Sequence, residues 1–243
     1  MRIAVIADIH GNLPALEAVL ADLGNRSVDT VVDLGDCASG PLWPRETCER
    51  LMGLGLRTVR GNHDRQVTSL APAAMGPSDL HARGALGDRH LAWLAALPPA
   101  LSWDGILAVH GAPGDDLAYL ADEIRDGRLV AADPDAVLRR LGEIEARIVL
   151  CGHSHQPRLI APRPGLLVIN PGSVGLPAYD DTAPPHVSET GSPHARYAVL
   201  TLGPGLPAVD FVALPYDHAA AAARAEANGR PDWAHALRTG RMP

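Results

Sequence analysis

Short polar clusters recur along this 243-residue chain, and their side chains are of the types that bind metal ions in enzymes. The donors are carboxylates, one amide and imidazoles, with no thiolate: Asp8, His10, Asp36, Asn62, His110, His153 and His155. Such a set suits manganese, iron, zinc or nickel in a reactive centre better than a structural zinc. Seven ligands exceed the needs of one ion, so two ions are predicted. Asp36, central in the order, is the candidate bridge, because an anionic oxygen between two cations screens their repulsion.

Two of these histidines are separated by a single residue. His153 and His155 follow the apolar run 148–150, which predicts a buried strand. If the extended path continues through them, both side chains leave the backbone on the same side, as a metal site requires. The alternative is that Gly152 starts a turn and both histidines are solvated loop residues. The tetrapeptide alone does not decide between the two.

The elements that must position these residues begin at the N-terminus. Strand-like runs at 3–8, 30–36 and 57–64 enclose apolar patterns of helical spacing at 13–24 and 43–54. This βαβαβ order predicts parallel, buried strands, because crossover connections are right-handed and short. The carboxyl ends of such strands gather along one edge of a sheet, and the first polar clusters fall on that edge.

The remainder of the chain is predicted to be helical first and strand-rich later. Residues 64–98 read as helices, with Ser78 as the N-cap of one of them, and 115–142 as mostly helical with loops. Further strands are expected at 105–111, 146–155, 165–173, 195–203 and 207–214, the later ones antiparallel. Residues 176–195, rich in Pro, Ser and Thr, are predicted to be an excursion loop, and 217–238 a helix packed on the outside.

Composition limits the class of protein. With a net charge of −7, a broad nucleic-acid-binding surface is not expected, although short nucleotides remain candidate substrates. The length suits a single domain over residues 1–243. The first strand leaves no room for a secretion signal ahead of it, and no apolar run reaches the ~20 residues of a membrane span. The expectation is a cytoplasmic protein without a membrane partner, which could be a homo-oligomer.

Taken in order, five motifs resemble those of the calcineurin-like metallophosphoesterases: D-x-H, G-D, G-N-H-D, H-G and G-H-S-H. Each motif alone is weak, but five in the family order on strand ends form a joint signal. The compact length and "NPGSVG" followed by "ARYAVL" resemble the small bacterial phosphodiesterase branch. The resemblance implies an α/β fold, a four-layer αββα sandwich with two facing mixed β-sheets.

The resemblance also implies roles for single residues. It assigns one metal to Asp8, His10, Asp36 and His155, and the other to Asp36, Asn62, His110 and His153. It places His63 near the leaving-group oxygen as a catalytic residue, with Asp64 either orienting it or capping the following helix. Asn12 and Arg65 are candidates for substrate binding, although a turn or capping role for Asn12 and a solvated one for Arg65 are the simpler alternatives.

The implied activity is hydrolysis of phosphate esters with two divalent cations, manganese being the expected ion in vitro. Most favoured is a phosphodiesterase acting on small or nucleotide-type substrates by direct in-line attack of a metal-bridging hydroxide. The alternatives are a phosphomonoesterase, including a protein phosphatase, and a non-catalytic metal-binding scaffold of the same fold. The retromer subunit of this fold lacks the histidine that corresponds to His63, which this chain has.

Overall fold

Two five-stranded mixed sheets face each other in the computed structural model, which describes residues 1–243. In spatial order the first sheet comprises β14 (Ala208–Leu214), β13 (Ala195–Thr201), β1 (Arg2–Ile6), β2 (Thr30–Asp33) and β3 (Arg57–Thr58). The second comprises β4 (Ala100–Trp103), β5 (Ile106–Val109), β8 (Ile148–Leu150), β10 (Leu166–Pro171) and β9 (Pro157–Arg163). Apolar side chains from both sheets, such as Val5 and Leu150, form one buried cluster between them.

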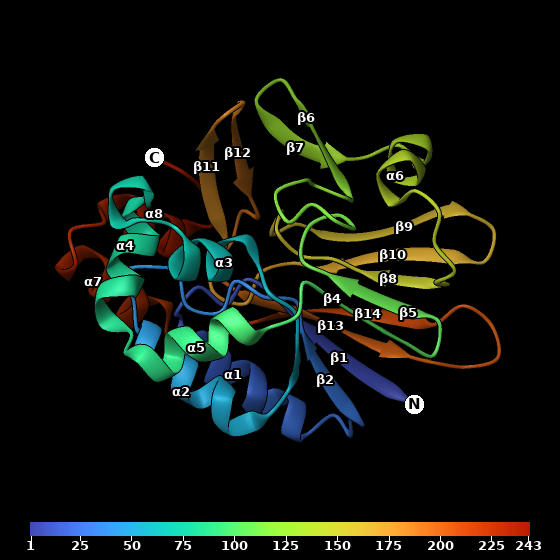
Figure 1. The fold of residues 1–243 in the computed structure, drawn as a ribbon, viewed down its shortest axis with the longest axis horizontal. Helices are drawn as coiled ribbons and strands as arrows, with labels where there is room; N and C mark the ends of the chain where they lie inside the picture. The colour runs from blue at the N-terminus through green and yellow to red at the C-terminus, as the bar shows by residue number, and fades with distance from the viewer.

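Helices cover the outer faces of both sheets. On the first sheet α1 (Leu13–Gly24), α2 (Pro44–Leu54), α3 (Asn62–Ser69), α4 (Pro77–Ala85) and α5 (Asp88–Ala96) contribute to one core cluster. On the second, α6 (Pro134–Leu141) lies apart from the others, beside β9 (Figure 1). The four layers and the mixed sheets agree with the predicted fold. None of the helices combines the length and apolar character needed to cross a membrane.

The N-terminal βαβαβ prediction is confirmed. β1 pairs with β2 and β2 with β3 in parallel, while β13 runs antiparallel to β1 and to β14. The strand β1 is buried along almost its whole length because it lies in the middle of a sheet covered on both faces. Its carboxyl end and those of β2 and β3 therefore open at one edge.

A third, four-stranded sheet was not predicted, and we call it the cap sheet. It consists of β11 (Ala178–Thr182), β12 (Pro185–Glu189), β7 (Arg128–Ala131) and β6 (Asp122–Arg125), and it stands at the top of Figure 1. The expected loop over 176–195 is instead the β11–β12 hairpin. The mostly helical interpretation of 115–142 is also wrong, because only α6 lies there alongside β6 and β7.

The cap sheet was not predicted because most of its buried positions are polar. In β12 the buried side chains are those of His186 and Ser188, so hydrophobic alternation is missing. The β6–β7 hairpin does carry a local signal, since it turns at Asp126 and Gly127, both with positive φ. An Asp-Gly pair is favoured in such tight turns.

Other expectations were also corrected. Strands β4 and β9 were not foreseen. The helix α4 begins at Pro77 with Gly76 as its N-cap, so Ser78 lies within the first turn. The C-terminal helix is two helices, α7 (His218–Ala227) and α8 (Pro231–Thr239), separated around Gly229 with its positive φ. One face of α8 packs inward, against the candidate site described below.

Candidate metal centre

All seven predicted ligands lie where strands end. Asp8 and His10 follow β1, Asp36 follows β2, Asn62 begins α3 after β3, His110 follows β5, and His153 and His155 follow β8. The first four thus come from the first sheet and the last three from the second. Because the two sheets face each other, the loops from both meet at the same edge.

The backbone at five of these residues is left-handed. Asp8, His10, Asp36, His153 and His155 have φ values of 55°, 52°, 57°, 67° and 59°. Such values are uncommon outside glycine, although Asp and His tolerate them better than most residues. Strained backbone of this kind persists at sites where the surrounding structure enforces it for function. The extended path therefore does not continue from β8 through the two histidines, and a turn places them.

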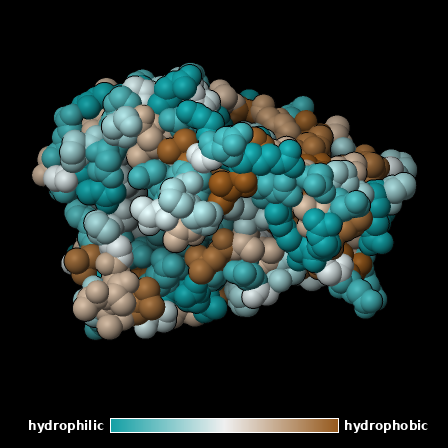
Figure 2. Space-filling model, turned by 90° about the horizontal axis from the view of Figure 1, so that it is seen from above, coloured by the Kyte–Doolittle hydropathy of each residue, from teal (hydrophilic) through white to brown (hydrophobic).

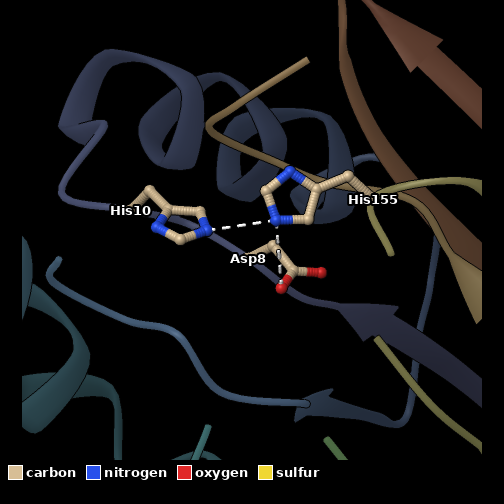
Figure 3. Close-up of side chains that lie close together, drawn as sticks. All are labelled: Asp8, His10 and His155. Atoms are coloured by element: carbon tan, nitrogen blue, oxygen red, sulfur yellow. Dashed lines mark hydrogen bonds and ion pairs between the residues drawn. The ribbon is translucent and has the colours of Figure 1, made fainter. Parts of the chain in front are cut away.

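The ligand atoms fall into two groups. Asp8, His10 and His155 form one and Asp36, His110 and His153 the other, with the atoms of each group within 4.8 Å of one another. In the first group, shown in Figure 3, His155 Nε2 lies 3.1 Å from His10 Nε2 and 3.5 Å from Asp8 Oδ1. The histidines at 153 and 155 thus enter different groups, in the same division that the resemblance implies.

Asp36 lies between the two groups. Its Oδ2 is 3.3 Å from His110 Nε2 and 3.9 Å from His10 Nε2. The carboxylate is nearly inaccessible, at 1% exposure, and its Oδ1 accepts a hydrogen bond from the backbone N–H of His63 at 2.9 Å. One oxygen is therefore anchored to the protein while the other faces both groups, which is the position that a bridging ligand needs.

The histidine rings are each fixed by a backbone carbonyl. The contacts are His10 Nδ1 to Ser39 O at 2.8 Å, His110 Nδ1 to Leu34 O at 2.7 Å, His155 Nδ1 to Leu176 O at 2.8 Å, and His153 Nε2 to Leu117 O at 3.0 Å. A carbonyl oxygen only accepts, so each of these nitrogens donates, and in a neutral ring the opposite nitrogen presents its lone pair to the centre. Hydrogen bonding of this kind orients metal-binding histidines.

Burial keeps three of the rings neutral. It lowers the pKa of His10 to about 4 and that of His153 to about 3, and it holds the pKa of His155 well below its usual range. For His110, burial acts to lower the pKa, but the Asp36 carboxylate raises it to about 10. Neutral imidazole is the form that binds a metal ion.

The amide of Asn62 faces the second ligand group. Its Oδ1 lies 3.0 Å from His110 Nε2, and the same end of the amide is 3.3 Å from Asp36 Oδ2 and 3.1 Å from His153 Nδ1. Carboxylate oxygen, amide oxygen and imidazole nitrogen are ligands of divalent transition metals, so the donor set fits a metal ion.

His63 lies at the rim of the centre, with 32% of its side chain exposed. Its Nδ1 is 2.7 Å from Asp79 Oδ1, and Ser39 Oγ donates to the same carboxylate oxygen at 2.7 Å. Burial acts to lower the pKa of His63, but the Asp36 and Asp79 carboxylates raise it to about 9. With Nδ1 engaged, Nε2 is the atom available to a substrate in the cavity that His63 lines.

Asp79 was missed by the sequence reasoning, which considered Asp64 for the orienting role. The Asp64 carboxylate instead accepts from the backbone N–H groups of Gly61 at 2.9 Å, Asp36 at 2.9 Å and Cys37 at 3.0 Å. It therefore caps α3, the second of its two predicted roles, and ties the loop of Asp36 to that helix. Asp79 gave no signal, because an Asp in the first turn of a helix is common without a catalytic partner.

The two predicted substrate-binding residues are engaged elsewhere. Asn12 is fully buried; its Oδ1 accepts from Ala15 N at the start of α1, and its Nδ2 donates to Gly175 O at 2.8 Å. The Arg65 guanidinium forms a two-pronged pair with Asp116, at 2.6 and 2.7 Å. Contact of either residue with phosphate stays a prediction. The capping alternative for Asn12 agrees with its contacts, whereas Arg65 is ion-paired rather than solvated.

Several residues of the cavity wall were assigned no role from the sequence. The centre opens into a cavity of about 550 Å³ whose lining includes Tyr119, Tyr179, His186, Arg230 and Trp233. The first three belong to the cap sheet or the loop before it, and the last two to α8 and its N-cap. They come from the segments whose structure the sequence did not predict correctly.

Comparison with protein families identifies this arrangement. A model of the calcineurin-like phosphoesterase superfamily domain matches residues 1–190, which contain every predicted ligand. The chain belongs to the calcineurin-like phosphoesterase superfamily. Proteins of this superfamily depend on metal ions, in agreement with the two ligand groups.

Individual relatives support the same fold. A crystal structure of a metallophosphoesterase from Sphaerobacter thermophilus is 26% identical, with a TM-score of 0.75, covering 99% of each chain. A crystal structure described as a putative diadenosine tetraphosphatase is 19% identical, with a TM-score of 0.54, over 88% of this chain and 94% of that one. An uncharacterized protein of Methanocaldococcus jannaschii is 47% identical over 62 residues, 26% of this chain and 26% of that protein.

Proposed function

We propose that this phosphoesterase superfamily member is a phosphodiesterase that acts through two divalent cations, held by the seven predicted ligands and bridged by Asp36. The observation that carries the proposal is the pair of ligand groups that meet at Asp36 Oδ2. When bound, the two cations would supply an acidified water for in-line attack at phosphorus and would neutralise charge on the phosphoryl oxygens. Manganese is the ion proposed for reconstitution.

The protein's own groups would then position the ester and deal with the leaving group. The ring of His63 is held through Nδ1 by Asp79, so its Nε2 can donate a proton to the departing oxygen. Asp64 fixes the backbone that carries both Asp36 and Gly61, which keeps His63 in register with the centre. A non-catalytic scaffold would not need His63 to be held in this orientation by Asp79.

The charge of the cavity favours diesters over monoesters. A monoester carries close to two negative charges at neutral pH and a diester only one, so a monoesterase gains from cationic side chains near the phosphate. Arg230 is the single arginine in the cavity lining, the chain has no lysine, and the guanidinium is paired with Asp232 at 2.6 Å. His63, whose pKa is raised to about 9, is the other cationic side chain of the lining, and it is paired with Asp79 at 2.7 Å, so no unpaired cationic side chain lines the cavity.

The test compares two esters with the same leaving group. Protein reconstituted with manganese, iron, zinc or nickel is assayed with p-nitrophenyl phosphate and bis-p-nitrophenyl phosphate, and kcat/KM is measured for both. We expect the diester to be the better substrate. A faster monoester would overturn the diesterase assignment, and no turnover of either ester with any of the four metals would overturn hydrolysis itself. His63→Ala serves as the catalytic control.

A further inference from the structure

Three aromatic rings stand just beyond the predicted ligands. Tyr119 stacks on the ring of His153 with centroids 4.9 Å apart, and Tyr179 meets His155 edge-on at 4.7 Å. Trp233 of α8 meets His10 at 5.9 Å. All three rings line the cavity, so a group bound next to the phosphate would meet neutral, largely apolar surfaces.

The wall that carries the two tyrosines is held by its own hydrogen bonds. The hydroxyl of Tyr119 lies 2.8 Å from that of Tyr179 and 2.8 Å from His186 Nε2. His186 in turn contacts Pro184 O through Nδ1 at 2.7 Å. These polar atoms are hydrogen-bond partners of one another, so the two tyrosine rings are held in place in the cavity wall.

The outer part of the cavity is acidic. Asp180 and Asp181 of β11 line it, are exposed, and form no ion pair. Asp181 Oδ1 accepts only from the backbone N–H of Ala183, at 3.0 Å. Two exposed carboxylates without counter-charge therefore line the cavity. Figure 2, viewed from the side of the cap sheet, shows a mostly hydrophilic surface with scattered hydrophobic residues.

Arg230, the one arginine that lines the cavity, does not offset them. The Arg230 guanidinium binds both oxygens of Asp232, at 2.6 to 3.2 Å, and donates to Ser78 Oγ at 2.9 Å. Its charge is neutralised and its donors are directed at protein atoms. The outer cavity thus has an excess of negative charge that comes from the β11 pair.

We infer, on the basis of the proposed function, that the site selects esters that contain a single phosphate and whose organic group beyond that phosphate is neutral or cationic. A second phosphate on that group would meet the Asp180–Asp181 pair without a compensating cation. Like charges brought together across a binding surface disfavour the wrong partner, and such repulsion between partly exposed groups weakens as salt rises. The cap sheet is then a specificity element, and oligophosphate compounds are poor substrates.

Two chromogenic esters that differ only in the distal charge test this selection. They are the p-nitrophenyl ester of thymidine 5′-phosphate and the same compound with a 3′-phosphate, so the leaving group and the base stay constant. We expect kcat/KM to be about tenfold lower for the 3′-phosphorylated ester at low salt, with the gap narrowing at high salt. Equal or faster turnover of the 3′-phosphorylated ester would overturn the inference and leave diester hydrolysis intact.

A variant pair assigns the effect to β11. In Asp180→Asn the ratio of kcat/KM between the unphosphorylated and the 3′-phosphorylated ester should fall by about two- to threefold, because one unpaired charge is removed. The matched control is Asp126→Asn, at an exposed aspartate in the β6–β7 turn that does not line the cavity, and its ratio of kcat/KM values for the two esters should equal that of the wild type. The assignment is contradicted if this ratio is unchanged in Asp180→Asn, or if it falls equally in Asp126→Asn.

Binding measured without turnover separates this inference from the proposed function. Calorimetry on the manganese-loaded protein should show thymidine 3′,5′-bisphosphate binding more weakly than thymidine 5′-phosphate. Tighter binding of the bisphosphate would overturn the inference, whatever the esters do. Weaker binding of the bisphosphate together with no hydrolysis of either ester would support the acidic selection and remove the diesterase activity.

Discussion

The ring of His63 is held on one side by Asp79 and opens on the other to the cavity. General acid catalysis contributes about 10²- to 10⁴-fold and matters most for basic leaving groups. His63→Ala should therefore lose about that factor in kcat and keep two metals, with the larger loss on a diester that releases an alkoxide. The loss is checked by measuring kcat on an alkyl diester and on a p-nitrophenyl diester, and the metal content by elemental analysis. Loss of a metal would make His63 a ligand, and equal losses on both esters would remove the acid role.

We predict that Asp79 acts on the reaction through His63, whose Nδ1 lies 2.7 Å from its Oδ1. Asp79→Asn should lower kcat about tenfold and leave the metal content unchanged, because the neutral amide holds the imidazolium less well. The double variant with His63→Ala should be no slower than His63→Ala alone, since the two residues act as a unit. A further loss in the double variant would show that Asp79 acts independently, for instance by stabilising α4.

The two histidines of the G-H-S-H motif, His153 and His155, belong to different ligand groups. His153→Ala and His155→Ala should both lose activity but should empty different metal positions. His155→Ala should remove the ion beside Asp8, and His153→Ala the ion beside His110. Anomalous scattering from crystals of each variant locates the remaining ion, and loss of the same ion in both variants would contradict the division.

At the scale of the elements, the loop after β1 depends on a close approach by another loop. Gly175 donates its N–H to Asp8 O at 3.0 Å, and a Cβ at this position would lie 1.7 Å from Ile9 O. Gly175→Ala must therefore displace the backbone that carries Asp8 and His10, and overpacking of this kind costs about 1–3 kcal/mol or more.

The matched control for this substitution is Gly203→Ala, where a Cβ would meet nothing within 4 Å. Thermal unfolding and metal titration of both variants are the measurements. Gly175→Ala should unfold at a lower temperature and bind metal more weakly, whereas Gly203→Ala should match the wild type. Equal metal affinity in the two variants would show that the β1 loop tolerates displacement.

The elements differ in how far the sequence determined them. β1 and β2 were predictable because they are largely apolar and buried toward their ends, and β3, of only two residues, followed from the alternation of strands and helices. Each ends in a short polar cluster at the same edge. The cap sheet was not predictable, since three of its four buried strand residues, Asp122, His186 and Ser188, are polar and its strands bury little apolar surface. The ligands were found by residue type and order. Asp79 could not be found in this way, because its partner His63 lies 16 residues away on another helix.

For the molecule as a whole, the centre exists only where the two large sheets meet. Each ligand group takes residues from both: Asp8 and His10 join His155, while Asp36 joins His110 and His153. Metal binding is therefore linked to the packing of one sheet on the other, and bound ions stabilise the folded state in proportion to their affinity. The ligand geometry that results could not be calculated from strand patterns, because it depends on left-handed turns at five of the ligands.

The central claim is a pair of metal ions bridged by Asp36, and anomalous scattering from crystals of manganese-reconstituted protein tests it most directly. Two peaks about 3.5–4 Å apart are expected, one within the group of Asp8 and the other within that of His110, with the Asp36 carboxylate between them. Asp36→Asn should lower the occupancy of both. A single peak, peaks outside both groups, or full occupancy in Asp36→Asn would contradict the claim.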